Sequence, residues 1–336
     1  MVLMGKQNNA FQILKKMIDD HNHFVVISHI YTDGDALGAV MAFYHYLKSL
    51  GKKVEAIIPG SLPARYDFLK TRQAINRHSK SRLKKIIERA DVILIVDISA
   101  LERMDEWYAP VMASKAKKVC IDHHPDMCEQ MDLKIIDVQR IATCEIVYDF
   151  FKTQGIEITD DMALALYTGI LSDSGGFRFE GTSGKTLEIA AQLARKNIDP
   201  AWVYRQVYEY SNKNQLRFWG HVLAGLQSEG VIDWAVVSRE TLQKFNVNIE
   251  ELNGLIDIIR RDAAAQIFAM FVEKKNGEVM VGLRSKNGFD VGQLARRFGG
   301  GGHFHAAGFS SSLPLREVVQ MTLEQIKQDQ VLSPEE

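Results

Sequence analysis

Cysteine is scarce in this sequence. The 336 residues include three cysteines, Cys120, Cys128 and Cys144, and no CxxC pair. An odd number without paired spacing argues against a disulfide framework and against a structural zinc site, which needs closely grouped ligands. We expect these thiols to be buried and neutral, as in a reducing compartment.

Long apolar runs are also missing. No stretch approaches the roughly 18 consecutive apolar residues that a membrane span requires. The first 20 residues alternate apolar and charged side chains too closely for a secretory signal. We therefore expect a cytoplasmic protein with no membrane partner.

The sequence has no excess of charge of either sign. Lys and Arg number 41 against 42 for Asp and Glu, for a formal net charge of -1. Proteins that bind long nucleic acids usually present a basic face, so this balance argues against a platform for long nucleic acid. A small anionic substrate bound by a few local cations remains compatible with it. The length suits two domains.

The first half of the chain alternates short apolar runs with helical patterns. Strand-like runs occupy residues 24–28, 54–58, 91–97, 117–122 and 133–137. Between the first two of these, an apolar helical pattern begins at residue 36 and ends at Gly51, a common helix stop. Strands that alternate with helices indicate βαβ units, and so an α/β fold with a doubly wound, mainly parallel sheet.

The second half of the chain contains a helical region followed by a region of strand-like runs. Residues 142 to about 225 show helical patterns, and strand-like runs return at 231–238, 266–285 and 305–311. An Asn-Gly pair inside the second of these runs predicts a hairpin. We predict a catalytic domain over 1–195, a helical linker over 196–227 and a smaller α/β domain with a mixed sheet over 228–330.

Carboxylates and imidazoles stand where the predicted elements of the first half stop. They are His29, Asp33, Asp35, Asp97, Asp122, His123, His124 and Asp173. In open α/β sheets, ligands bind beyond the carboxyl ends of the strands, where such residues can converge. Each aspartate alone could be a helix cap or a turn residue, Asp35 in particular, and the two histidines could lie on the surface. The whole set is harder to explain in this way, because clustered carboxylates repel one another.

A pair of divalent cations would relieve this repulsion. Imidazole and carboxylate ligands without thiolates suit Mn²⁺, with Mg²⁺ or Co²⁺ as substitutes. Gly34 lets Asp33 and Asp35 face one site from a single tight turn. Two cations a few ångströms apart can bridge a water, lower its pKa and neutralise a phosphoryl group during in-line attack.

The acidic residues belong to four short motifs. These are SHIYTDGDALGA (28–39), VDIS (96–99), DHH (122–124) and GILSDSGGFRF (169–179). A fifth motif near the C-terminus is GLRSKNGFDVGQLARRFGGGGHFHAAG (282–308). In this order the motifs resemble those of the DHH phosphoesterase superfamily with its substrate-binding DHHA1 domain. The nearest subgroup is the short-oligonucleotide nucleases that also dephosphorylate 3′-phosphoadenosine 5′-phosphate (pAp), and the resemblance covers nearly the whole chain.

The resemblance implies two metal ions in each active site. One ion would be bound by His29, Asp33 and Asp97. The other would be bound by Asp35, Asp97, His123 and Asp173. The carboxylate of Asp97 would therefore bridge the two ions.

The remaining two residues of the DHH motif receive catalytic roles by the same resemblance. Asp122 would lie behind the ligands and orient an imidazole. His124 would face the substrate phosphate as a hydrogen-bond donor or general acid. Tyr31-Thr32 and Ala39 depart from the family pattern, but neither departure removes a ligand.

A glycine run marks the predicted second domain. Neither the Lys-Ser/Thr pair of a P-loop nor a GxGxxG after the first strand is present, and a lone glycine run could be only a flexible turn. By the resemblance, backbone N–H groups of this run would approach an anion. The implied substrate-binding residues are Arg178, Arg284, Ser285, Gly300, Gly301, Gly302 and His303. His305 could equally well pack inside the domain.

The resemblance implies a hydrolase that acts on short RNA of about two to five nucleotides, on pAp, or on both, with a bridging hydroxide activated by two metal ions. Hydrolysis of cyclic di-AMP or its linear product pApA is one alternative. Hydrolysis of pyrophosphate or polyphosphate is another, and a RecJ-like exonuclease is a weaker one. A nucleotide sensor without activity fits poorly, because every implied ligand is present. The oligomeric state stays open, with a homodimer among the candidates.

Overall fold

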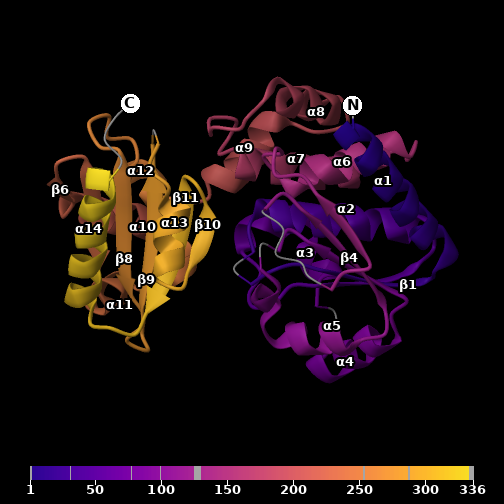
Figure 1. Ribbon diagram of the computed structural model, residues 1–336, viewed down its shortest axis with the longest axis horizontal. Helices are drawn as coiled ribbons and strands as arrows, with labels where there is room; N and C mark the ends of the chain where they lie inside the picture. The colour runs from indigo at the N-terminus through magenta and orange to yellow at the C-terminus, as the bar shows by residue number, and fades with distance from the viewer. Residues whose placement is uncertain are drawn as a thin grey trace. The chain divides into compact units, whose positions relative to one another are not determined.

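The computed structural model describes residues 2–30, 32–76, 78–98, 100–124, 130–252, 254–286 and 288–332 (Figure 1). Contacts divide the chain into two units, Met1–Tyr210 and Ser211–Glu336. This division falls inside the predicted linker, so that helix α9 (Pro200–Tyr208) belongs to the first unit and α10 (Lys213–Ala224) to the second. The boundaries at 195 and 228 stay predictions.

A five-stranded parallel sheet forms the centre of the first unit (Figure 1). Its strands are β1 (His23–Ile27), β2 (Lys53–Ile57), β3 (Val92–Val96), β4 (Lys117–Asp122) and β5 (Leu133–Ile136). The order across the sheet is β2-β1-β3-β4-β5, and every pairing is parallel. The predicted doubly wound sheet is therefore confirmed.

Helices cover both faces of this sheet. The larger layer contains α1 (Val2–Asp20), α2 (Gly34–Ser49), α6 (Thr143–Thr153), α7 (Asp160–Asp173), α8 (Gly184–Ala194) and α9. The other elements are η1 (Ala64–Leu69), α3 (Thr71–Ala74), α4 (Lys80–Arg89), η2 (Leu101–Trp107) and α5 (Tyr108–Ala113). Alternate residues of β1 pack into opposite cores, with Phe24 and Val26 on the side of α2 and Val25 and Ile27 on the side of α4. Strand β1 is thus packed from both sides.

The second unit has a mixed six-stranded sheet, as predicted. Its strands are β6 (Gln227–Glu229), β7 (Ile232–Val237), β8 (Ile267–Glu273), β9 (Val279–Ser285), β10 (Gly301–His303) and β11 (Ala306–Ser311), in the order β10-β11-β9-β8-β7-β6. Only β7 and β8 pair in parallel. The predicted hairpin joins β8 to β9, with Gly277 at φ +85° and the N–H of Lys274 donating to the carbonyl of Glu278.

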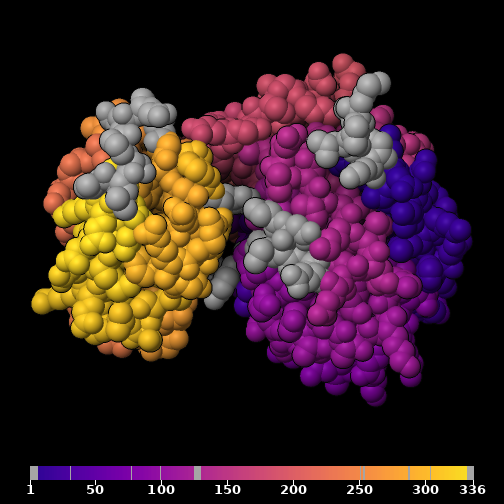
Figure 2. Space-filling model, viewed as in Figure 1, coloured from indigo at the N-terminus to yellow at the C-terminus, as the bar shows by residue number. Residues whose placement is uncertain are grey.

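Helices also cover both faces of the second sheet. They are α10, α11 (Arg239–Phe245), η3 (Ile249–Leu252), α12 (Leu255–Ile259), α13 (Val291–Arg297) and α14 (Leu315–Leu332). Alternate residues of β8 face the two cores, with Phe271 toward α13 and α14 and Phe268 toward α10 and α12. The yellow atoms of α14 form much of the visible face of this unit (Figure 2). Among the described residues, no helix combines the length and apolarity needed to cross a membrane.

Candidate metal centre

The six predicted metal ligands come from distant segments and meet at the carboxyl edge of the first sheet. Their ligand atoms form two groups, in each of which all of these atoms lie within 4.8 Å of one another. One group is His29, Asp33 and Asp97, and the other is Asp35, His123 and Asp173. A third group within the same limit joins Asp97 to the DHH motif and consists of Asp97, Asp122, His123 and His124. The structure therefore brings together every residue for which a metal role was predicted.

Asp97 lies between the two groups. One carboxylate oxygen, Oδ2, is 3.6 Å from Nε2 of His29, and the other, Oδ1, is 3.6 Å from Nε2 of His123. Burial alone would raise the pKa of Asp97, but the hydrogen bond and positive charge of the surrounding histidines hold it well below the usual range. Its backbone has φ +53°, a left-handed conformation that is uncommon outside glycine. This geometry suits a carboxylate shared by two ions.

Backbone carbonyls set the tautomers of the two ligand histidines. Nδ1 of His29 lies 2.7 Å from the carbonyl of Ile30, and Nδ1 of His123 lies 3.2 Å from that of Arg140. Because a carbonyl only accepts, these contacts place a proton on each Nδ1, although a guanidinium nitrogen of Arg103 also lies 3.2 Å from Nδ1 of His29. Burial opposes it, but the hydrogen bond to Asp97 and the charge of Asp33 raise the pKa of His29, so a metal ion would replace a proton on its Nε2. In both rings Nε2 is the nitrogen that faces the carboxylates. Metal-binding histidines in proteins have this arrangement.

The two aspartates of the first motif are used differently. Asp33 caps α2, because its Oδ1 accepts from the N–H groups of Asp35 and Ala36 at 3.1 Å each. Asp35 lies fully buried in the first turn and accepts from the N–H of Thr143 at 2.6 Å and of Cys144 at 3.0 Å. The helix that Asp35 caps is therefore α6, and not the one that follows it in sequence.

Gly34 allows the first and fourth motifs to meet. A Cβ atom at Gly34 would lie 2.5 Å from Cβ of Ser172 and 3.2 Å from the hydroxyl of Tyr66. No real side chain fits at such distances, so only glycine permits this approach of α2 to α7. Asp33 and Asp35 thereby come within reach of Asp173.

The buried carboxylates of the centre repel one another, and a bound cation would relieve this repulsion. Burial and the neighbouring carboxylates raise the pKa of Asp173 well above its usual value, with Asp33 the largest of these charges. Burial, followed by Asp97, has the same effect on the pKa of Asp35. Carboxylates grouped without a counterion oppose one another's ionisation. The donor set, imidazole nitrogen and carboxylate oxygen without thiolate, fits hard or intermediate divalent cations.

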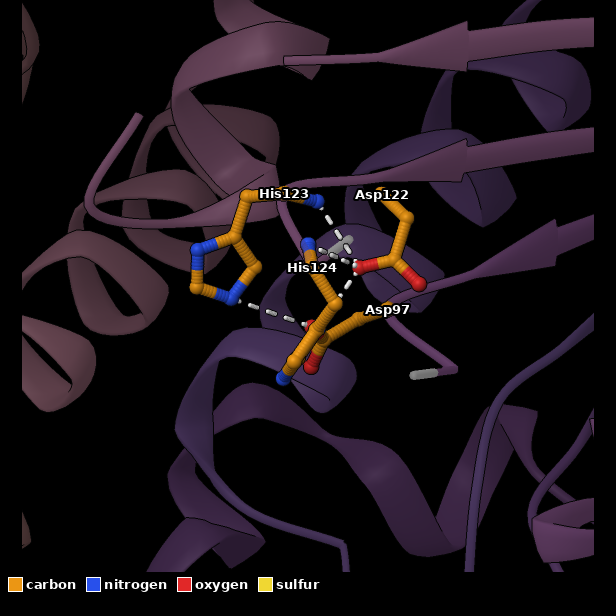
Figure 3. A group of neighbouring side chains, drawn as sticks. All are labelled: Asp97, Asp122, His123 and His124. Carbon is orange, nitrogen blue, oxygen red and sulfur yellow. Dashed lines mark hydrogen bonds and ion pairs between the residues drawn. The ribbon is translucent and has the colours of Figure 1, made fainter. Parts of the chain in front are cut away.

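Asp122 lies beside His124, and its carboxylate is directed at the two histidines of the motif (Figure 3). Its Oδ1 accepts from the N–H groups of His123 at 2.8 Å and His124 at 3.0 Å, and from Nδ1 of His124 at 2.7 Å. Its Oδ2 accepts from the N–H of Ile98 at 2.8 Å. Although burial opposes it, the hydrogen bond and charge of His124 lower the pKa of Asp122. Both oxygens are thus occupied by donors, which supports a positioning role.

The predicted substrate residues of the second unit have contrasting surroundings. The guanidinium of Arg284 is half-buried, donates to the carbonyl of Leu283 and lies 3.9 Å from Asp257. Burial lowers the pKa of Arg284, an effect that Asp257 opposes. Ser285 is buried, and its hydroxyl bonds the carbonyl of Phe289 at 2.7 Å and Nδ1 of His305 at 2.9 Å. Its side chain therefore positions other residues of this unit, and a substrate contact by Ser285 stays a prediction.

The glycine run has several structural functions. Gly299, at φ +76°, and Gly300 close the end of α13, donating to the carbonyls of Arg296 and Ala295. A Cβ at Gly300 would lie 2.2 Å from the carbonyl oxygen of Gly308 in β11, and one at Gly302 would lie 2.5 Å from the backbone of Ala306. Of the three predicted anion-binding glycines, only Gly301 has open space around it.

Two predicted side chains lie outside these groups. Arg178, five residues beyond Asp173, is exposed, and its guanidinium lies 5.4 Å from the ring centre of Phe179. The side chain of His303 falls outside the described part of the chain. Both substrate roles stay predictions.

Sequence reasoning missed one segment that contacts the metal centre. Residues 140–144 supply the carbonyl that accepts from His123, the N–H groups that bind Asp35 and a hydroxyl beside Asp97. In the sequence, this segment shows only the start of an amphipathic helix. The absence of a capping side chain at its start, Ala142, was the one available signal.

Comparisons with known proteins bear on both units. The DHH family N-terminal domain matches residues 23–170, and the DHHA1 domain matches residues 232–329. The chain belongs to the DHH–DHHA1 phosphoesterase family. The predicted membership is confirmed, and all six predicted ligands except Asp173 lie inside the first matched segment.

Named relatives of this DHH–DHHA1 chain are distant but similar in length. The probable bifunctional oligoribonuclease and PAP phosphatase NrnA of Streptococcus mutans is 27% identical over 90% of this chain and 94% of its own. The bifunctional oligoribonuclease and PAP phosphatase NrnA of Bacillus subtilis is 26% identical over 88% of this chain and 92% of its own. A crystal structure of an exopolyphosphatase-related protein from Bacteroides fragilis has a TM-score of 0.90 at 28% identity, covering 96% of each chain.

Proposed function

We propose that this protein is a metal-dependent phosphoesterase that hydrolyses short RNA and pAp in the cytoplasm. The observation that carries the proposal is the pair of ligand groups joined at Asp97. The names of the Streptococcus mutans and Bacillus subtilis relatives support the substrates. The balanced net charge of -1 agrees with a substrate that carries few phosphates.

The proposed metal is Mn²⁺, two ions per site, with Mg²⁺ or Co²⁺ as substitutes. His29, Asp33 and Asp97 would bind one ion. Asp35, Asp97, His123 and Asp173 would bind the other. When bound, such a pair neutralises charge on a phosphoryl group and makes water a stronger acid.

Protein groups complete the chemistry. Asp122 orients His124 through the 2.7 Å hydrogen bond to Nδ1. This bond fixes the proton on Nδ1 when the ring is neutral, and protonation of Nε2 then gives a general acid for the leaving oxygen. The carboxylate of Asp122 stabilises the resulting imidazolium, as its lowered pKa indicates.

Substrate selection is assigned to the second unit. Arg284 has only one hydrogen bond within the described residues and a long 3.9 Å approach to Asp257, so its planar donors can bind a phosphate. Gly301 has the open surroundings that close approach of an anion needs. His303 and Arg178 are proposed as additional contacts.

A second candidate is hydrolysis of a phosphoanhydride such as polyphosphate or pyrophosphate. It is favoured by the similarity in fold and sequence to the exopolyphosphatase-related protein. The two candidates share the metal centre and differ in the need for a nucleoside.

A substrate panel with Mn²⁺ separates the candidates. Purified protein is assayed for phosphate or nucleotide release from RNA of two to five nucleotides, pAp, pApA, cyclic di-AMP, pyrophosphate and polyphosphate. We expect release from short RNA and pAp, with much lower kcat/KM for pyrophosphate. Preference for polyphosphate would replace the proposed substrates with the second candidate, and no turnover of any substrate would refute the enzyme.

The contribution of the second unit is tested with Arg284→Ala. We expect KM for pAp to rise while Mn²⁺ binding, measured by calorimetry, stays that of the unmodified protein. Arg316→Ala, a charge-matched change in the exposed first turn of α14, is the control. Loss of bound Mn²⁺ in Arg284→Ala would contradict the assignment of this residue to substrate.

A further inference from the structure

One short segment contacts three of the six metal ligands. In residues 140–144, the carbonyl of Arg140 accepts from His123, and the N–H groups of Thr143 and Cys144 bind Asp35. The third ligand is Asp97, whose Oδ1 lies 3.2 Å from the hydroxyl of Thr143. No other side chain in this segment contacts the shared carboxylate among the described residues.

The segment is firmly anchored. Before α6, the side chain of Arg140 forms ion pairs with Asp137 at 3.2 Å and with Asp149 at 2.5 Å. At the start of α6, Asp35 accepts the N–H groups that Ala142 leaves without a side-chain cap. Thr143 is fully buried, and as a β-branched residue it has few χ1 choices in a helix. Its hydroxyl is therefore fixed relative to Asp97.

The direction of this hydrogen bond is determined by its partner. An ionised carboxylate only accepts, so the Thr143 hydroxyl donates to Oδ1 of Asp97. The same oxygen lies 3.6 Å from Nε2 of His123, while Oδ2 faces His29 at the same distance. The hydroxyl thus sets the rotation of the carboxylate so that one oxygen is directed at each ligand group.

We propose that Thr143 is a positioning residue of the metal centre, which orients Asp97 so that it can serve both ions. The inference rests on the proposed metal dependence, but not on the identity of the substrate. Oxygen Oδ1 would accept from the hydroxyl and offer its other lone pair to an ion, whereas Oδ2 faces His29 and accepts from no hydroxyl among the described residues. Loss of the hydroxyl frees the carboxylate to rotate, and affinity falls most for the ion on the His123 side.

The test is a comparison of Thr143→Val, which keeps the shape of the side chain, with Thr143→Ser, which keeps the hydroxyl. Mn²⁺ alone is titrated into each metal-free protein by calorimetry, and steady-state kinetics follow with the best substrate of the panel. We expect Thr143→Val to bind Mn²⁺ about 10–100-fold more weakly, the range for residues that orient metal ligands. Its kcat falls at limiting Mn²⁺ and recovers as Mn²⁺ is raised, while Thr143→Ser stays close to the unmodified protein.

A matched control is Thr322→Val in α14. Thr322 is also fully buried, and its hydroxyl bonds a helix carbonyl, that of Val318, in the second unit. Thr322→Val should change the Mn²⁺ affinity by less than about twofold, because the substituted residue is independent of the metal centre. Unchanged Mn²⁺ affinity in Thr143→Val would overturn the proposal. If that variant does not fold, Thr143→Ser and Thr143→Ala are compared, and equal affinities in this pair would also overturn it. Normal Mn²⁺ binding by a protein that hydrolyses nothing would refute the proposed function alone.

Discussion

At the scale of single residues, Asp97 combines a strained backbone with a shared position. A left-handed φ in a residue other than glycine costs of order 1 kcal/mol, and such residues cluster at functional sites. Asp and Asn tolerate this conformation better than other residues because their short polar side chains bond locally. The conformation directs the carboxylate between His29 and His123.

Asp97→Asn tests the shared position while keeping the backbone preference. The amide keeps one neutral oxygen and gains an NH2 group that cannot bind a metal, so one ion would lose this ligand and the other would keep only a weaker one. We expect kcat/KM to fall by more than about 100-fold, since even residues behind the ligands account for 10–100-fold. Enzyme assays with Mn²⁺ measure this, and Asp19→Asn, a change at an exposed carboxylate on α1, is the control. Turnover close to that of the control would rule out the two-ion site.

Asp173→Asn tests whether repulsion between carboxylates destabilises the metal-free protein. A carboxyl whose pKa is raised on folding destabilises the folded state at neutral pH, and stability returns as pH falls through the folded pKa. Removing this charge should therefore raise Tm in EDTA at neutral pH, by about 2–4 °C for each kcal/mol of repulsion relieved.

Thermal unfolding with and without Mn²⁺ checks this expectation. The advantage of Asp173→Asn should shrink toward pH 4, where the unmodified carboxyl is increasingly protonated. With Mn²⁺ the order should reverse, because only the unmodified protein has all of its ligands. A variant less stable than the unmodified protein in EDTA would show that Asp173 is not repelled by its neighbours.

The ligand residues could be predicted from sequence because parallel strands place their ends at one edge. The hydrogen bonds between these residues could not. Asp35 and Thr143 are 108 positions apart, and the lack of a capping side chain at Ala142 does not identify Asp35 as the residue that caps α6. The left-handed backbone conformation of Asp97 could not be predicted from the sequence either, since it depends on packing around the end of β3.

At the scale of elements, the centre depends on how closely α2 approaches α7. Gly34→Ala would place a methyl group 2.5 Å from Cβ of Ser172. We expect a loss of about 1–3 kcal/mol in the free energy of unfolding, as for other overpacked sites, and weaker Mn²⁺ binding because Asp33 and Asp35 move away from Asp173. Denaturant unfolding and Mn²⁺ titration measure the two effects.

Two further variants test this prediction, one as a rescue and one as a control. Ser172→Gly in the background of Gly34→Ala removes the clashing atom and should restore part of both properties. Gly184→Ala, at the start of α8 where a Cβ meets nothing within 4 Å, should be neutral or slightly stabilising. Equal behaviour of Gly34→Ala and Gly184→Ala would mean that this close approach does not matter.

The glycine run allows a second test at the same scale. Gly300→Ala would meet the backbone of β11 at 2.2 Å, so the second unit should lose stability. Gly301→Ala meets nothing within 4 Å and should leave Tm unchanged while raising KM for pAp, if an anion approaches this backbone. Calorimetry and steady-state kinetics separate the two. An unchanged KM in Gly301→Ala would remove Gly301 from the substrate site.

Elements were predicted well where side chains signal them. The five parallel strands have apolar β-branched runs, whereas β6 is the polar segment QSE and β10 is GGH. Both of these strands were missed, because they are edge strands of three residues whose pairing depends on a neighbour and not on their own composition.

At the scale of the whole molecule, the two units have separate cores. Every buried residue of the clusters around the first sheet precedes residue 211, and every one around the second sheet follows it. All six proposed ligands belong to the first unit. Metal binding should therefore stabilise the first unit directly.

Calorimetry of the full chain tests this division. We expect two unfolding transitions. Mn²⁺ at a concentration 100 times Kd should increase the free energy of unfolding for only one of them, by about 2.7 kcal/mol. Asp97→Asn should abolish the shift without moving the other transition. A Mn²⁺-dependent shift of both transitions together would show that the units unfold as one.

The capping of α6 by Asp35 bears on the choice of reagents for finding the natural substrate. A trap for cellular nucleotides must bind its target without consuming it, and it must survive purification. Changing Asp35 would remove a ligand and also leave the N–H groups of Thr143 and Cys144 without their acceptor. Among its described contacts, Asp173 does not accept from the backbone of a neighbouring helix, and removal of its charge relieves repulsion between carboxylates. Asp173→Asn is therefore the form to immobilise for capture from cell extracts.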